Sequence, residues 1–402
     1  MRTVLFVAPF LLDATLKFVQ AAAAVPGVRL VVITQDEPEK VPAGAQHWKV
    51  SDATRTDTIV DAARQIIART GGAHCILGIL ENIQDQLAEA RVVLGLPGIT
   101  PDVARRFRDK GVMKTALRNA GLPCARHARI RTAHDAWRFI EDVGYPIVIK
   151  PPDGAGCRAT YQVNSPDDLT EALRELRPSP EREALAEEFV VGDEHSFDTL
   201  TIDGKPVFHN IGRYLPGPLD VMRNEWIQWC VYLPREIHGP AFDGIRKAGF
   251  AANTALGLGT AFTHMEWFRR PDGSPVISEV GARPPGAQFT SLMSWAYDRS
   301  MYAAWAHAMI DGRVEGTFER RYSAGVAFLR GAGQGKVARV ENLELAQRKV
   351  GHLVVEAKLP VVGRPRASGY EGEGYVIVRH PETRVVTDAL STIIQTIRVH
   401  YA

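Results

Sequence analysis

The chain has 402 residues, 45% of them hydrophobic and 23% charged, and a formal net charge of +2. This length exceeds one ordinary hydrophobic core and predicts two or three domains. The near-neutral charge provides no large basic field, which argues against a nucleic-acid partner. No run reaches the ~18 uninterrupted apolar residues of a membrane helix, so no membrane partner is expected. The four cysteines are widely spaced without a CxxC pair, which argues against a zinc site or disulfide framework and favours a cytoplasmic location.

Residues 1–108 alternate between strand-like and helix-like runs. The N-terminal stretch MRTVLFVAPFLLDATLKFVQAAAA has some features of a signal peptide, but Pro9, Asp13 and Lys17 interrupt its apolar run, so a strand followed by a helix fits better. The alternation continues through VRLVVIT, a helix over 56–70 and HCILGIL, which predicts an open parallel sheet with helices on both faces. The GxGxxG fingerprint is missing after the first strand, which argues against a nicotinamide-dependent dehydrogenase.

The region after residue 108 predicts a different architecture, of mixed α+β type. A connecting helix opens at Thr100-Pro101 and ends near Gly121, and a small α+β unit then covers about 124–186. A larger half over about 187–319 contains a meander that turns at Asp203-Gly204, a hairpin over 263–286 and a helix over about 290–310. Residues 320–402 predict a small β-rich cap that ends in an amphipathic helix.

The stretch YPIVIKPPDGAGCRA contains the first candidate site. Lys150 ends an apolar strand, and a loop with Gly154, Ala155 and Gly156 follows it. A lysine in this position can direct its ammonium toward phosphates that the loop amides bind. A lysine at the end of a strand before an ordinary turn is an equal alternative.

The stretch ALAEEFVVGDEHSF places carboxylates on the next strand. Glu187, or the backbone beside it, could face the amino edge of a purine, and Glu194 could accept hydrogen bonds from ribose hydroxyls. A solvated edge strand explains this stretch better when it is taken alone.

Two glutamates occupy strand positions in the hairpin THMEWFRRPDGSPVISEVGARPPG. Burying a carboxylate is costly unless a cation meets it. Glu266 and Glu279, on adjacent strands and facing one side, could bind Mg²⁺, which nucleotide sites hold with one or two carboxylates plus phosphates. Arg283 would project toward the same place, where its planar fork suits a phosphoryl group or carboxylate. A Glu/Arg ion pair on a surface hairpin is the alternative.

The order of these groups resembles the ATP-grasp superfamily from about Leu96 through Ile310. Strings of the type SHTE…IEIGARLGG belong to the L-amino-acid ligases of that superfamily, and THMEWF…ISEVGARPPG is similar to them. The resemblance implies an α/β and α+β protein with an ATP-grasp fold. It places a preATP-grasp, Rossmann-like open-sheet domain at 1–108, the ATP-grasp domain at 109–319 and a C-terminal α+β cap at 320–402.

The resemblance also implies a role for each matching residue. Lys110 and Lys150 would contact phosphates and Arg283 would stabilise the transferred phosphoryl group. The adenine-binding strand would comprise Glu187, Glu188, Phe189 and Val190, the ribose ligand would be Glu194, and the ligands of Mg²⁺ or Mn²⁺ would be Glu266 and Glu279. Gly281 stands where many ATP-grasp enzymes have an asparagine ligand, so one metal ligand is missing relative to the wider superfamily.

The function that the resemblance implies is an ATP-dependent carboxylate-amine ligase. Such an enzyme forms an acyl phosphate from a small carboxylate and passes the acyl group to an amine, releasing ADP and phosphate. Substrate candidates lie in the loop GRYLPGPLDVMRNEWIQW and are Arg213, Arg223, Glu225 and Trp226, although the tryptophans could simply pack the loop.

Two other functions remain open, namely an ATP-grasp enzyme that activates bicarbonate or formate and a nucleotide-binding regulatory protein without turnover. A mere binder does not need Arg283, which argues against the second. Similar enzymes are often dimers, so a homodimer is compatible with the resemblance.

Overall fold

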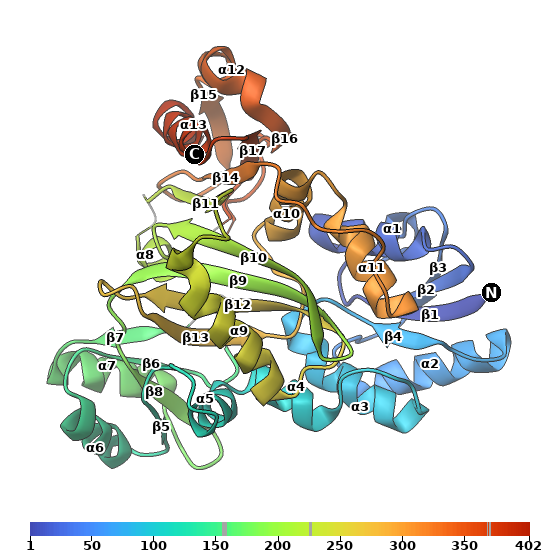
Figure 1. The fold of residues 1–402 in the computed structure, drawn as a ribbon, viewed down its shortest axis with the longest axis horizontal. Coiled ribbons are helices and arrows are strands. Elements are labelled where there is room, and N and C mark those ends of the chain that lie inside the picture. The colour runs from blue at the N-terminus through green and yellow to red at the C-terminus, as the bar shows by residue number, and fades with distance from the viewer. Residues whose placement is uncertain (155–158, 225–226, 368, 370) are drawn as a thin grey trace.

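The computed structural model describes residues 1–154, 159–224, 227–367, 369 and 371–402. The large β-sheet runs through the middle of the molecule, the N-terminal parallel sheet and the small sheet lie at different sides of it, and a cap extends from its upper end (Figure 1). The predicted fold class is confirmed, since a parallel sheet, a small antiparallel sheet and a large antiparallel sheet follow one another along the chain. In the described part of the chain no helix is long and apolar enough to cross a bilayer.

The N-terminal region forms a parallel sheet of order β3-β2-β1-β4. Its strands are β1 (Arg2–Val7), β2 (Val28–Thr34), β3 (Ala45–Lys49) and β4 (Cys75–Leu77), and its helices are α1 (Asp13–Ala23), α2 (Thr56–Thr70) and α3 (Gln84–Leu94). Short 3-10 helices η1 (Pro38–Lys40) and η2 (Glu81–Ile83) lie in its loops. The central strands β1 and β2 are apolar and buried over most of their length because helices cover both faces of the sheet. The stretch that resembles a signal peptide thus forms β1 and α1.

The connecting segment is broken where a single helix was predicted. It forms α4 (Pro101–Arg108) and α5 (Lys110–Asn119). Asp109 between them has extended backbone angles, and its carboxylate caps α5 by accepting from the N–H groups of Gly111 and Val112. The cap places Lys110 in the first turn of a new helix, where its side chain points into the molecule.

The small sheet has the order β5-β8-β6-β7. It comprises β5 (His127–Ile130), β6 (Ile147–Lys150), β7 (Tyr161–Val163) and β8 (Ala184–Glu188), with α6 (Ala133–Val143) and α7 (Pro166–Leu176). The predicted boundary at residue 187 falls inside β8, which pairs with β5 and β6. The domain boundaries otherwise stay a prediction.

The large sheet has eight strands in the order β13-β12-β9-β10-β11-β14-β17-β16. These are β9 (Asp193–Ile202), β10 (Lys205–Leu215), β11 (Trp229–Leu233), β12 (Ala261–Arg269), β13 (Pro275–Gly281), β14 (Ser323–Leu329), β16 (Val354–Lys358) and β17 (Gly374–His380). The sheet runs without interruption into the C-terminal region, because β11 pairs with β14. The predicted turn between β9 and β10 is found at Asp203 and Gly204, both with positive φ.

Helices flank the large sheet, and a two-stranded sheet completes the cap. The helices are α8 (Pro218–Arg223), α9 (Asp243–Leu256), α10 (Phe289–Tyr297), α11 (Met301–Asp311), α12 (Leu343–Val350) and α13 (Thr383–Thr396), with η3 (Pro240–Phe242) and η4 (Gly351–Leu353). The two-stranded sheet pairs β15 (Val337–Glu341) with β18 (Arg398–Tyr401). The predicted helix over 290–310 is two helices, because Asp298 adopts a left-handed conformation and Ser300 caps α11.

One hydrophobic core joins the parallel sheet to the large sheet. The rings of Phe6 and Phe18 contact Trp305 of α11 edge-on, with centroids 6.0 and 5.1 Å apart. The same core includes Phe289 of α10 and Trp229 of β11. This packing fixes the loops at the carboxyl ends of β1 and β4 against the large sheet, so N-terminal residues can take part in a site there.

Candidate functional site

A cavity of about 780 Å³ lies between the small sheet, the large sheet and the N-terminal loops. Nearly every described candidate residue lines it: Lys110, Lys150, Gly154, Glu187, Glu188, Phe189, Val190, Glu194, Arg213, Glu266, Glu279 and Arg283. Arg223 is not among the lining residues and donates to Gln162 Oε1 at 2.7 Å. The candidates Ala155, Gly156, Glu225 and Trp226 lie outside the described residues.

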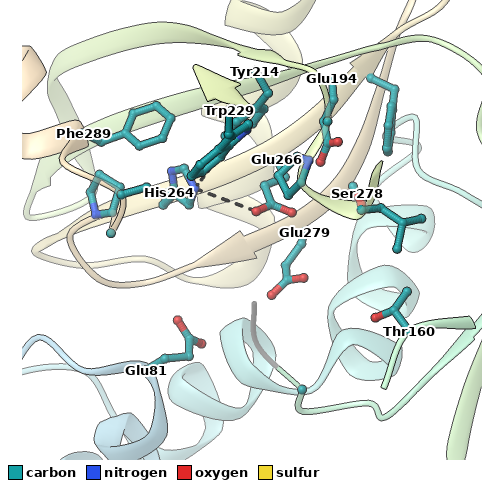
Figure 2. A pocket seen from close by; sticks show the side chains of 18 of the residues that line it. Glu81, Thr160, Glu194, Tyr214, Trp229, His264, Glu266, Ser278, Glu279 and Phe289 are labelled. Atoms are coloured by element: carbon teal, nitrogen blue, oxygen red, sulfur yellow. Dashed lines mark hydrogen bonds and ion pairs between the residues drawn. The ribbon is translucent and has the colours of Figure 1, made fainter. Parts of the chain in front are cut away.

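The two hairpin glutamates face the same side of the sheet. Glu266 of β12 and Glu279 of β13 are direct cross-strand partners, so their side chains leave one face together. Ser196 of β9 is the partner of Glu266, and Glu194 lies two residues before it on the same face. The three carboxylates converge on one space in Figure 2. The two side chains that were predicted to share a cation therefore face the same space.

The electrostatics of these carboxylates fit a cation. Burial, and then the neighbouring charge of Glu279, raise the pKa of Glu266. Burial and the charge of Glu266 likewise raise the pKa of Glu194 well above its usual range. In the described residues no group of three or more His, Cys, Asp or Glu side chains forms a closed metal cage. An open pair of carboxylates suits Mg²⁺ that takes its other oxygens from phosphates and water.

Both predicted phosphate lysines point into this acidic space. Lys110 Nζ lies 3.0 Å from Glu279 Oε1 and donates to the Gly154 carbonyl at 2.5 Å. Lys150, the last residue of β6, has its Nζ 3.1 Å from Glu187 Oε2. Burial lowers the pKa of Lys150, but the charges of Glu187 and Glu279 raise it above the usual value overall. Lys150 is thus charged, and Lys110 is in direct contact with Glu279 of the carboxylate pair.

Lys114 is a buried part of the site that the sequence analysis missed. Its Nζ donates to the Ser278 carbonyl at 2.8 Å and lies 3.4 Å from Glu187 Oε2. It stands one helical turn after Lys110 on α5, and this spacing on one helix face could have indicated it. Lys114 therefore links α5 to both β8 and the strand that carries Glu279.

The sequence analysis offered either the Glu187 side chain or the backbone beside it as the group that faces a purine, and the contacts of Glu187 favour the backbone. Its carboxylate pairs with Lys114 and Lys150, and Glu188 accepts from the backbone N–H and the guanidinium of Arg126. Burial raises the pKa of Glu187, but the two lysines lower it below the usual value overall. With both side chains engaged, the backbone from Glu188 to Val190 is the part of the segment suited to bind an adenine edge.

Replacing Lys114 by methionine should destabilise the fold. The change removes a charge but keeps most of the side-chain volume, and it leaves the buried Glu187 carboxylate with Lys150 as its remaining lysine partner. Breaking a buried ion pair from one side costs roughly 3–5 kcal/mol. The urea midpoint of Lys114→Met should fall accordingly, whereas Lys349→Met on the exposed face of α12 should unfold like the parent. Equal midpoints for both variants would show that Lys114 contributes no net stability.

Arg283 is held by Glu81, a residue of the N-terminal region that the sequence analysis missed. Arg283 Nε donates to Glu81 Oε2, and Arg108 Nη1 donates to Glu81 Oε1 at 2.8 Å. A Cβ added at Gly281 would lie 3.2 Å from Glu81 Oε2. The close approach of Glu81 thus gives a physical reason for glycine where many ATP-grasp enzymes have asparagine.

Glu81 should make the free energy of unfolding depend on pH in the acid range. Burial alone raises its pKa, but Arg283 and Arg108 lower it from 4.5 to about 2. Because the pKa of Glu81 is lower in the folded state than in the unfolded state, Glu81 contributes stability at pH values above its unfolded-state pKa. This contribution is lost as the pH falls through the folded-state pKa. Between pH 6 and pH 3 the contribution of Glu81 to the free energy of unfolding should fall by about 2 kcal/mol. Urea unfolding of Glu81→Gln should depend less on pH over that range by this amount, and parallel curves for parent and variant would contradict the assignment.

Other residues of the cavity wall are held by contacts within the protein. Arg213 lines the cavity but pairs with Asp193 at 2.8 Å near its rim. Trp229 is buried, stacks against Tyr214 and donates its Nε1 to the Pro216 carbonyl, so it packs the loop and also forms a cavity wall. His264 also lines the cavity, and its Nδ1 lies 2.5 Å from Asp198 Oδ1.

The chain is similar in sequence to known proteins over part of its length. Residues 143–291 match the ATP-grasp domain family. The L-arginine-specific L-amino acid ligase of Bacillus subtilis is 24% identical over 264 residues, which cover 64% of this chain and 63% of that enzyme. The chain thus spans less than two thirds of the length of this relative.

Two solved structures are similar along the whole chain. The L-amino acid ligase from Bacillus licheniformis superposes with a TM-score of 0.81 at 20% identity, covering 100% of this chain and 99% of that one. The N5-carboxyaminoimidazole synthetase from Staphylococcus aureus, complexed with ADP, superposes with a TM-score of 0.75 at 15% identity, covering 98% and 97%. At these identities the likeness concerns the fold.

Proposed function

Because the chain carries an ATP-grasp domain and has the ATP-grasp fold, we propose that it is an ATP-dependent carboxylate-amine ligase acting on amino acids or related small carboxylates. The observation that supports this best is the pairing of Glu266 with Glu279 on one face, beside Lys110 and Lys150. ATP-grasp enzymes use ATP and Mg²⁺, and the resemblance of the hairpin to L-amino-acid ligases is matched by similar proteins of that name.

The reaction needs charge neutralisation and positioning more than covalent help from the protein. A carboxylate oxygen of the substrate attacks the γ-phosphorus, the bond to the bridging oxygen breaks, and ADP leaves. The amine nitrogen then forms a bond to the acyl carbon, phosphate leaves with the electron pair of the C–O bond, and the nitrogen loses a proton to solvent.

The residues of the cavity divide this work. Lys110 and Lys150 would bind the phosphate oxygens, and Arg283, positioned by Glu81, would meet the charge that develops on the transferred group. Glu266 and Glu279 would hold Mg²⁺, which when bound neutralises phosphate charge. The walls around these groups keep bulk water from an acyl phosphate, which water would otherwise hydrolyse.

The proposal is tested by incubating the protein with ATP, Mg²⁺ and pools of amino acids and measuring ADP and phosphate. We expect at least one pool to release both products stoichiometrically with a new amide. AMP and pyrophosphate would indicate an adenylating enzyme. Phosphate release that needs bicarbonate or formate but no amino acid would indicate the carboxylase-like alternative, and ATP binding without any turnover a regulatory protein.

A further inference from the structure

Beyond Lys110, Lys150 and the paired glutamates, the cavity also has a part with largely apolar walls. Residues from the N-terminal loops, from the segment after the hairpin and from the large sheet form these walls: Leu12, Phe18, Ile79, Leu80, Trp229 and Phe289. Figure 2 shows Phe289 and Trp229 on the side of the carboxylates that His264 occupies. A nucleotide does not need aliphatic walls around its transferred phosphate, so this part suits the substrate that is activated there.

Glu371 brings a carboxylate to this apolar part from the C-terminal region. It is half-buried, lines the cavity and lies three residues before Gly374, the first residue of β17. Burial raises its pKa, while the Ala287 backbone N–H and the more distant charge of Lys358 oppose this effect. Among the described residues no lysine, arginine or histidine lies within ion-pair distance of Glu371. Glu81, another carboxylate that lines the cavity, is already bound by two arginines.

The backbone beside Glu371 is held in an unfavourable conformation. Ala287 and Gln288 follow one another with φ of 48° and 61°, a left-handed pair without glycine. Each such residue costs about 1–3 kcal/mol, and such strain clusters at ligand-binding sites. Ala287, which follows Arg283 by four residues in the chain, and Gln288 line the same cavity as Glu371.

We propose that Glu371 binds the ammonium group of the substrate whose carboxylate is activated, so that this ligase selects an amino acid over a simple carboxylic acid. This inference rests on the proposed ligase function. Arg283 and the metal-binding end receive the carboxylate, Glu371 receives the ammonium, and the apolar walls receive an apolar side chain. A buried carboxylate and an ammonium compensate each other's loss of hydration when they pair directly.

The ammonium that Glu371 binds belongs to the activated substrate and not to the attacking amine. An attacking amine must be neutral at nitrogen, since its lone pair forms the new bond. A carboxylate in direct contact would favour the protonated, unreactive form. The activated amino acid, in contrast, keeps its ammonium unchanged through the reaction.

The test compares Glu371→Gln with a matched control in the same loop, Glu373→Gln. Glu373 accepts from the Ala367 N–H and the Tyr401 hydroxyl, each at 2.8 Å, and does not line the cavity. Binding of L-leucine, L-methionine and L-phenylalanine to the Mg·ADP-loaded protein is measured by calorimetry. The same titration uses the desamino analogues 4-methylpentanoate, 4-(methylthio)butanoate and 3-phenylpropanoate. Binding does not depend on turnover, so the result is independent of the ligase assay.

We expect the parent and Glu373→Gln to bind at least one of these amino acids more than tenfold tighter than its desamino analogue. Glu371→Gln should weaken amino-acid binding about 10- to 100-fold and leave analogue and ADP binding unchanged, the range of a charged hydrogen bond. Equal affinities of parent and Glu371→Gln, or no preference of the parent for amino acids, would overturn the inference. ADP release in the pool assay would then still support the ligase, whereas selective binding without ADP release would refute the ligase and keep the ammonium site.

Discussion

Replacing Glu279 by glutamine should lower the rate of ADP release by about 100-fold or more at saturating ATP and substrate. Glutamine preserves the shape of the side chain but removes the negative charge that faces Glu266 across the hairpin. The variant would hold a divalent cation with a single hairpin carboxylate, so the phosphates would be less well neutralised as the reaction proceeds. The variant also loses the negatively charged partner of Lys110, whose Nζ lies 3.0 Å from Glu279 Oε1.

The measurement is a coupled ADP assay over a range of Mg²⁺ concentrations. The Mg²⁺ concentration that gives half-maximal rate should rise in Glu279→Gln, which distinguishes lost cation binding from a general folding defect. Glu344→Gln changes an exposed carboxylate on α12 and serves as the matched control, with the parent's rate and Mg²⁺ dependence expected. If Glu279→Gln kept a rate within about fivefold of the parent, the hairpin pair would not carry the cation.

The site was predictable wherever a charge interrupts a strand pattern. Glu266 and Glu279 stand out because a half-buried strand rarely carries a carboxylate, and their pairing follows from the two-residue period of a hairpin. Lys150 stands out for the same reason at the end of an apolar strand. At these positions the proposed chemistry needs a charged side chain where the strand pattern would have an apolar one, so the exception is visible in the local sequence.

Residues that act through tertiary contacts gave no comparable signal. Glu81 follows β4 in an ordinary loop, and only the packing of the parallel sheet on α11 brings it to Arg283. Lys114 looks like one more polar residue of an amphipathic helix until β8 is placed beside it. The break at Asp109 was missed because a single capping carboxylate, without glycine or proline, divides the helix.

The continuity of the large sheet into the C-terminal region could not be predicted from the hydrophobic pattern either. The strands after residue 320 read as a separate cap, yet β14 extends the large sheet by pairing with β11. Strand order depends on which edges meet in space, and the hydrophobic pattern of a strand does not encode its neighbour. The same uncertainty made β8 look like the start of the larger half, although it lies in the middle of the small sheet.

Replacing Arg283 by alanine should lower the rate of ADP release by about 1,000-fold, the largest single loss expected here. The guanidinium is anchored by Glu81 through Nε and by the Pro284 carbonyl through Nη1, and Arg283 is one of the residues that line the cavity. A group that meets charge only as it develops in the transition state affects kcat more than the KM for ATP.

A second variant separates the direct role of Arg283 from its positioning. Glu81→Gln keeps the guanidinium but loses its charged anchor, so kcat should fall by only about tenfold while the KM for ATP stays near the parent's value. Arg283→Lys keeps a charge without the planar fork and should resemble alanine more than the parent, because lysine cannot make two parallel hydrogen bonds to one phosphoryl group. Arg313→Ala removes an exposed arginine and is the matched control. A loss in Arg283→Ala that appears in the KM for ATP with kcat unchanged would place Arg283 in nucleotide binding and not in the transfer step.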